Sequence, residues 1–98
     1  MEAAYLERAA ETLKTVAHPV RIQIIDLLEK GEMSVNELSN CLGLAQPYTS
    51  QQLNLMKSKG ILASRREGNM VYYSIANLSV VKIIHCVRGQ AGADTGQT

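Results

Sequence analysis

The sequence predicts a mainly helical fold that carries one β-hairpin near its C-terminal end. Apolar residues recur every three or four positions over most of the chain, which is the spacing of helices that bury one face. After Gly60 the spacing changes to two, which is typical of strands. A chain of 98 residues supports one core. We therefore expect a single domain over residues 1–87 and a disordered, patternless tail over residues 88–98.

Two helices are predicted in the first third of the chain. Residues 3–17 place apolar side chains, among them Leu13 and Val16, along one helical face. Pro19 separates this helix from the next, because the residue before a proline avoids helical dihedral angles while proline itself suits a first helical turn. The second helix, residues 19–30, has little polar face, so we expect it at the centre of the core.

The next two helices are short and are joined by a tight turn. Ser34 and Glu37 have the spacing of a capping box, in which each side chain accepts a hydrogen bond from a backbone amide at the start of a helix. Gly43 suits the left-handed conformation that ends a helix, and Pro47 suits the first turn of a helix that continues towards Gly60. Two helices joined in this way are typical of a helix-turn-helix unit.

A hairpin and a last helix complete the predicted fold. Residues 61–66 alternate as a strand does, residues 67–69 have the composition of a turn, and residues 70–75 are rich in strand-forming side chains. Asn77 is placed to cap a helix that ends near Val87. The order predicts a winged helix-turn-helix: four helices, the hairpin as the wing, and a fifth helix.

The outer face of the fourth helix has the side chains that reading the major groove of DNA requires. If Thr49, Leu53 and Met56 face the core, then at roughly 100° per residue the opposite face is polar. Side-chain amides match the hydrogen-bonding edge of adenine, while hydroxyl groups contact bases or phosphates. The residues predicted to contact DNA in this region are Gln46, Pro47, Tyr48, Ser50, Gln51, Asn54 and Lys57.

The hairpin and the composition both favour duplex DNA as the partner. Arg65 and Arg66 stand just before the predicted turn, where a wing meets the sugar–phosphate backbone, so we expect both to neutralise phosphates. The net charge of only +1 argues against indiscriminate binding of polyanions. The chain has no Phe and no Trp, so the stacking surfaces of many single-strand binders are missing.

Other classes of protein fit the sequence less well. No run approaches the roughly 18 apolar residues that crossing a bilayer requires, and the start of the chain lacks the pattern of a secretory signal, so we expect a cytoplasmic location. Without a nucleophile elbow, a phosphate-binding loop or a paired His–carboxylate motif, we expect neither an enzyme nor a cofactor. The remaining alternative is a winged helix that binds a protein partner, which salt-dependent binding to duplex would distinguish.

Four segments also follow one another in a familiar order. They are residues 17–21 (Ala-His-Pro-Val-Arg), residues 37–44 (Glu-Leu through Gly-Leu), residues 46–53 and residues 68–74. In this succession residues 5–87 resemble the ArsR/SmtB winged-helix repressors. The resemblance implies a homodimer, with the first and last helices at the interface, that leaves its operator when an inducer binds. Two-fold symmetry of the protein predicts an operator with an inverted repeat.

The sequence departs from this family at its metal sites. Ser34 and Asn36 stand where metal-binding cysteines would be, and Asn77 and Ser79 stand where the other common site begins with Asp and His. Hydroxyl and amide groups are poor ligands for zinc, nickel or cadmium, so we expect no metal sensing through either site. Gln52 replaces the family's usual His, so the operator sequence does not transfer.

Two cysteines leave a thiol-based signal open as an alternative. Cys41 and Cys86 are out of register with the cysteines of the family's persulfide-sensing members. Cys86 is expected to be a small apolar residue at the subunit contact, beside a structural or solvated His85. Cys41 is expected to be partly exposed, which a redox-active thiol requires. The alternative to a repressor that has no inducer is therefore one that responds, through these thiols, to a redox or small-molecule inducer.

Overall fold

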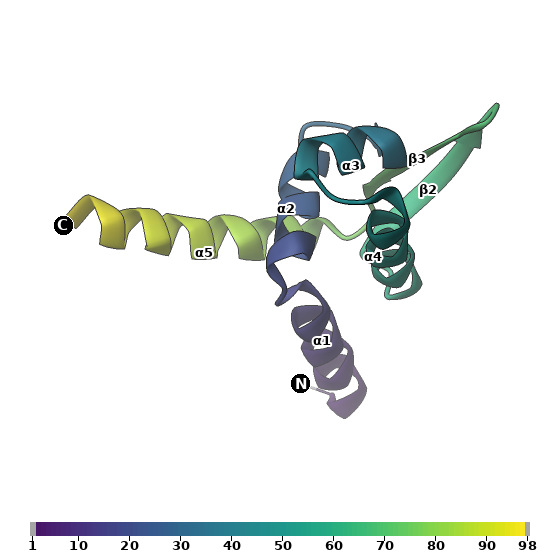
Figure 1. The fold of residues 1–98 in the computed structure, drawn as a ribbon. Coiled ribbons are helices and arrows are strands. Elements are labelled where there is room, and N and C mark those ends of the chain that lie inside the picture. The colour runs from purple at the N-terminus through teal and green to yellow at the C-terminus, as the bar shows by residue number, and fades with distance from the viewer. Residues whose placement is uncertain (1, 98) are drawn as a thin grey trace.

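The computed structural model describes the backbone of residues 2–97 and the side chains of residues 2–89. Over this range five helices and a three-stranded antiparallel sheet follow the predicted order, with one added strand. The elements are α1 (Ala3–Val16), α2 (Pro19–Leu28), β1 (Met33–Ser34), α3 (Val35–Leu42), α4 (Gln46–Ser58), β2 (Leu62–Glu67), β3 (Met70–Ile75) and α5 (Leu78–Gln97). In Figure 1, α1 and α5 project from the body of the molecule, and the β2–β3 hairpin projects away from α5.

The two N-terminal helices differ in how much of their apolar surface the chain itself covers. His18 caps α2, since its ring Nδ1 accepts a hydrogen bond from the amide of Val20 at 3.3 Å. Helix α2 is central, as predicted, with Ile24 and Ile25 buried. On α1 the buried residues lie only in the last turn, and Leu13 remains 47% exposed. The apolar face predicted for this helix therefore exists, but its own chain leaves it uncovered.

The helix-turn-helix forms through the predicted local signals. The amide of Glu37 donates to Ser34 Oγ at 3.1 Å, and the amide of Ser34 donates to Glu37 Oε1 at 2.9 Å, which completes the capping box. Gly43 ends α3 with a φ of 68°, in the left-handed region that favours glycine. Helix α4 starts one residue before Pro47. Its inner side packs into the core through Thr49, Leu53 and Met56, all fully buried.

The sheet has the order β1-β3-β2, so β3 lies in its middle. Strand β1 pairs with β3, Met33 opposite Tyr73 and Ser34 opposite Tyr72. This strand was not predicted, because two residues show no periodicity and the partner strand lies far along the chain. Its consequence is that the start of α3 is joined to the base of the wing.

Helix α5 begins as predicted and continues further than predicted. Asn77 Oδ1 accepts a hydrogen bond from the amide of Ser79 at 3.0 Å, and Val80 is buried where the helix crosses the core. The helix extends to Gln97, beyond the point where the sequence pattern ends. The tail predicted over residues 88–98 falls largely on side chains outside the described residues, so the division of the chain at residue 88 stays a prediction.

Two exposed polar contacts join the first half of α5 to the C-terminal half of α2 and the residue that follows it. His85 Nε2 lies 2.5 Å from Glu29 Oε1, and the guanidinium of Arg88 contacts the carboxylate of Asp26. His85 is about half exposed, in keeping with the structural or solvated role expected for it. Within the part of the chain that the structure describes, no helix has the length and apolar character needed to span a membrane.

Candidate nucleic-acid interface

The outward side of α4 presents the residues that the sequence predicts for DNA contact. Of the predicted residues, Gln46, Pro47, Tyr48, Gln51, Asn54 and Lys57 are exposed, and Ser50 is half-buried at the edge of this face; Ser58, in the last turn, is exposed as well. The helix therefore has an apolar inner side fixed in the core and a polar outer side, as the spacing predicts. We call the exposed residues of α4 the reading face.

The wing is attached to the C-terminal half of the reading face. Lys57 Nζ donates to Ser64 Oγ of β2 at 2.7 Å, and the hydroxyl of Tyr73 in β3 donates to Asn54 Oδ1 at 3.1 Å. Burial raises the pKa of the Tyr73 phenol. These contacts occupy part of the hydrogen-bonding capacity of Asn54 and Lys57, whereas the N-terminal half of α4 lies away from them.

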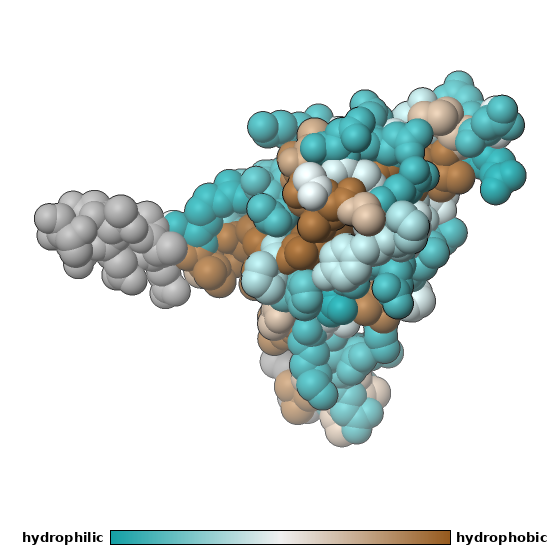
Figure 2. Space-filling view, in the orientation of Figure 1, coloured by the Kyte–Doolittle hydropathy of each residue, from teal (hydrophilic) through white to brown (hydrophobic). Residues whose placement is uncertain are grey.

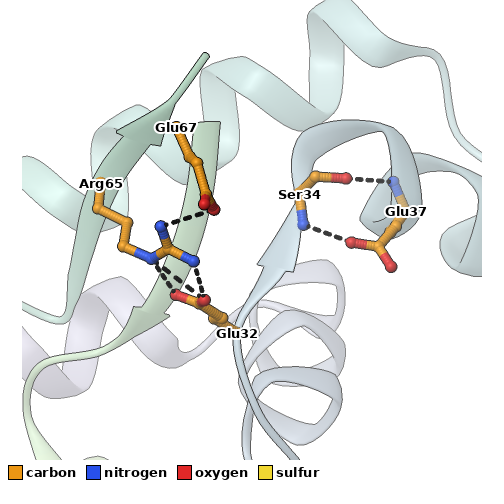
Figure 3. A network of polar contacts seen from close by, with 5 residues as sticks. All are labelled: Glu32, Ser34, Glu37, Arg65 and Glu67. Carbon is orange, nitrogen blue, oxygen red and sulfur yellow. Dashed lines mark hydrogen bonds and ion pairs between the residues drawn. The ribbon is translucent and has the colours of Figure 1, made fainter. Parts of the chain in front are cut away.

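Arg65 is engaged within the protein. Its Nε lies 2.9 Å from one carboxylate oxygen of Glu32, its Nη1 lies 3.0 Å from Glu67 Oε2, and its guanidinium carbon lies 4.9 Å from the centre of the Tyr72 ring. Figure 3 shows the guanidinium between the two carboxylates. Hydrogen bonding from Arg65 lowers the pKa of Glu32, and the two carboxylates raise the pKa of Arg65. The contacts join the wing to the segment before β1.

Arg66 lies on the other side of the same strand. Successive residues of a strand point to opposite faces, so Arg66 shares a face with Ser64, which contacts α4. The side chain of Arg66 is exposed. The sequence predicts opposite faces but the same phosphate contact for the two arginines. In the structure Arg65 contacts its acidic partners, whereas Arg66 shares the side of the wing that meets the reading face.

Gln52 lies on the inner side of α4 and is only 8% exposed. Its Oε1 accepts a hydrogen bond from Arg21 Nε of α2 at 2.9 Å. Arg21 Nη1 also donates to the backbone carbonyl of Thr15 at the end of α1, at 3.0 Å. Sequence reasoning did not assign this link. Its only local signal is that Gln52 lies among the buried positions of α4, beside Leu53, where an unpaired amide would be costly.

The structure also shows the surroundings of the two thiols and of the residues at the family's metal-site positions. Cys41 on α3 and Cys86 on α5 are free and exposed in the single chain, as expected for Cys41, and the place of Cys86 at a subunit contact stays a prediction. Ser34, at a metal-cysteine position of the family, is buried and used in the capping box. Among the residues that the structure describes, no three or more His, Cys, Asp or Glu side chains are grouped closely enough to hold a metal ion.

A second surface is apolar and lies away from the reading face. A hollow of about 590 Å³ opens between α1, α2 and the first half of α5, lined by Leu13, Val16, Ala17, Ile22, Gln23, Asp26, Ile83, Ile84, Val87 and Arg88. Beyond it, Tyr5 and Leu6 of α1 and Leu78 of α5 are each at least half exposed. Figure 2 shows apolar side chains uncovered on the part of α5 next to the body. We call this the α1/α5 surface.

Comparison with known proteins places the chain in a family. Residues 18–64 match the bacterial regulatory protein family arsR. An uncharacterized HTH-type transcriptional regulator of Mycobacterium tuberculosis is 42% identical over 80 residues, which are 81% of this chain and 70% of the relative. The biofilm growth-associated repressor of Agrobacterium fabrum is 38% identical over 84 residues, 83% of this chain and 72% of the relative.

A solved structure supports the same assignment. A solution structure from Mycobacterium bovis is described as the homodimeric winged helix-turn-helix DNA-binding domain of a possible ArsR-family transcriptional regulator. It superposes with a TM-score of 0.86 at 33% identity, over 98% of this chain and 89% of that one. The mainly helical fold with a hairpin wing is thereby confirmed. With the reading face, the wing and these relatives in agreement, the chain belongs to the ArsR family of bacterial regulatory proteins.

Proposed function

We propose that this chain is a homodimeric repressor that binds an operator duplex, with α4 in the major groove and the wing along the backbone. We therefore call α4 the recognition helix. The observation that carries the proposal is the polar, exposed reading face on a helix whose other side is locked in the core, with a wing attached beside it. A recognition helix needs this combination of rigid support and free hydrogen-bonding groups.

The α1/α5 surface supports the dimer. Leu13, Val87 and Leu78 are large apolar side chains with 47%, 57% and 69% of their surface exposed. Patches of this kind on a small protein mark interaction sites. A second copy of the chain can cover these side chains, because in a two-fold symmetric dimer each copy presents the same apolar patch to the other. Two-fold symmetry then places two recognition helices on one face of an operator with an inverted repeat.

The test of DNA binding starts from a random-sequence pool, because the operator is not known. The protein selects a duplex from the pool, which we call the preferred duplex, and a duplex of the same composition in shuffled order is the comparison. We expect tighter binding to the preferred duplex and a fall in affinity with rising salt for both. Absence of affinity for any duplex at low salt would contradict the proposal and favour a protein partner for the winged helix.

The two wing arginines are expected to differ. Arg66→Ala should weaken binding to the preferred and the shuffled duplex alike and lower the salt slope by about one for each subunit, because one phosphate contact is lost per wing. Arg65→Ala should leave the salt slope close to that of the parent, since its guanidinium is already paired with Glu32 and Glu67. Fluorescence anisotropy at several salt concentrations measures both. Equal slopes for the two variants would show that the wing does not meet DNA on the side proposed.

A thiol-responsive repressor is the second candidate, favoured by the exposure of both cysteines. Oxidation of an exposed thiol adds a polar group or a crosslink, and one thiol lies on α3 of the helix-turn-helix itself. Hydrogen peroxide should then weaken binding to the preferred duplex, dithiothreitol should restore it, and a Cys41→Ser, Cys86→Ser double variant should respond to neither. A double variant that loses DNA just as the parent does would exclude thiol sensing.

Zinc is expected to leave DNA binding unchanged, because Ser34, Asn36, Asn77 and Ser79 are poor ligands.

In this proposal the protein binds and does not catalyse, and it acts in the cytoplasm, where bacterial DNA is found.

A further inference from the structure

We infer that Arg21 and Gln52 are positioning residues that fix the recognition helix relative to α1. The inference rests on the proposed function and adds to it a pair of residues that do not read DNA themselves. Three helices meet at the guanidinium of Arg21: its own helix α2, the last turn of α1 through the carbonyl of Thr15, and the inner side of α4 through Gln52.

The carbonyl of Thr15 is free to accept this bond for a reason that lies in the sequence. In a continuous helix it would accept from the amide four residues later, and that residue is Pro19, which has no N–H. Thr15 is 5% exposed, so an unpaired carbonyl there would be costly. Arg21 Nη1 supplies the missing donor at 3.0 Å. The break that separates α1 from α2 thus creates the site that Arg21 fills.

Gln52 provides the second acceptor. It lies on the buried side of α4 between Thr49 and Met56, both of which are fully buried, and its amide oxygen is 2.9 Å from Arg21 Nε. The donors of a guanidinium lie in one rigid plane, so two acceptors bound to the same group are held at a fixed separation. The side chain of Arg21 therefore fixes the position of the end of α1 relative to the middle of the recognition helix.

The other polar link between α1 and the end of α4 is weaker. Lys59 Nζ lies 2.7 Å from Glu11 Oε1, and hydrogen bonding from Lys59 lowers the pKa of Glu11. Both side chains are more than a third exposed, and exposed ion pairs contribute little to holding a geometry. The pair serves as a natural control, since it joins the same two regions without a buried acceptor.

The link matters for DNA because α1 belongs to the proposed dimer interface and α4 to the reading face. The distance between the two recognition helices of a dimer must match the spacing of the half-sites, about one helical turn. That distance is set by how each α4 is held relative to its own α1. Loosening the link should weaken binding to the preferred duplex more than binding to a shuffled duplex. Only the preferred duplex requires both recognition helices to meet their half-sites at once.

The experiment is a double-mutant cycle on DNA affinity. Arg21→Met and Gln52→Met keep the approximate volume of each side chain while removing the hydrogen bonds. Each should weaken binding to the preferred duplex about tenfold, with little change in the salt slope. The double variant should be no weaker than the weaker single variant, because both changes remove one link. Glu11→Gln, the matched control, should bind as the parent does.

A conservative replacement separates positioning from base reading. Gln52→Glu keeps an acceptor for Arg21 and should retain most of the parent's affinity, whereas a base-reading amide replaced by a carboxylate would lose it. Thermal unfolding, followed by circular dichroism, establishes that each variant is folded at the assay temperature, so that lost affinity reports on position.

The outcomes distinguish this inference from the proposed function. A parent that binds the preferred duplex, with Arg21→Met binding equally well, would overturn the inference and leave the function standing. A double variant that loses about a hundredfold, the product of two independent effects, would also overturn it. A change of base preference in Gln52→Met alone would show that Gln52 reads DNA. A parent without duplex affinity would overturn the proposed function as well.

Discussion

Leu13→Glu is expected to separate the two subunits and to weaken binding of the preferred duplex by about 10²–10⁴-fold. Leu13 lines the hollow between α1, α2 and α5 and is 47% exposed in the single chain. A carboxylate placed there would have to be buried without a partner when two apolar patches meet, which opposes association. A monomer then engages each half-site separately and loses the gain in effective concentration that a dimer has.

Sedimentation velocity and anisotropy check this expectation together. Lys14→Glu, at the neighbouring position, changes the charge by more but does not line the hollow, so it should remain a dimer. A Leu13→Glu variant that sediments as the parent does and binds the preferred duplex equally well would place the dimer interface elsewhere.

Gln51→Ala is expected to cost about 1–3 kcal/mol in binding of the preferred duplex and far less on the shuffled one. Gln51 is exposed on the side of α4 opposite to the buried Leu53 and Met56. An amide in the major groove donates and accepts at once, which only the correct base matches, whereas alanine loses both bonds at that base pair alone.

Single base-pair substitutions in the preferred duplex provide the control for this prediction. The parent should discriminate at the contacted base pair, and Gln51→Ala should lose discrimination there while keeping it at the other positions. Unchanged discrimination throughout would mean that the reading face is centred on other residues, and the N-terminal turn of α4 with Gln46 and Tyr48 would be the next to test.

Local signals made most of the fold predictable. The capping box of Ser34 and Glu37, the left-handed Gly43 and the proline starts of α2 and α4 act within a few residues, so the sequence shows them directly. Strand β1 and the continuation of α5 to Gln97 were not predictable in this way. The strand depends on pairing with residues about forty positions away, and α5 continues where no apolar periodicity marks it.

The candidate site was predictable to the level of a helix face and no further. The exposure of Gln51 and the burial of Leu53 follow from helical geometry. The opposite faces of Arg65 and Arg66 also follow, from the alternation of residues 61–66. The pairing of Arg65 does not, because it depends on Glu32, which lies next to a strand that the sequence did not reveal. The partner of Gln52 is 31 residues away in the sequence, so only the folded arrangement shows it.

The position of Ser34 has a consequence for engineering a metal-responsive variant of this repressor. Cysteines at positions 34 and 36 would supply soft ligands, but Ser34 is 1% exposed, and its hydroxyl and amide close the first turn of α3. Removing such a cap costs about 1 kcal/mol. A thiolate there would have to turn away from the helix to bind an ion. Because Ser34 also pairs with Tyr72 of β3, ion binding would disturb helix start and wing together. Metal affinity and the folded geometry of the DNA-binding unit would then be thermodynamically linked, which is the property that a sensor requires.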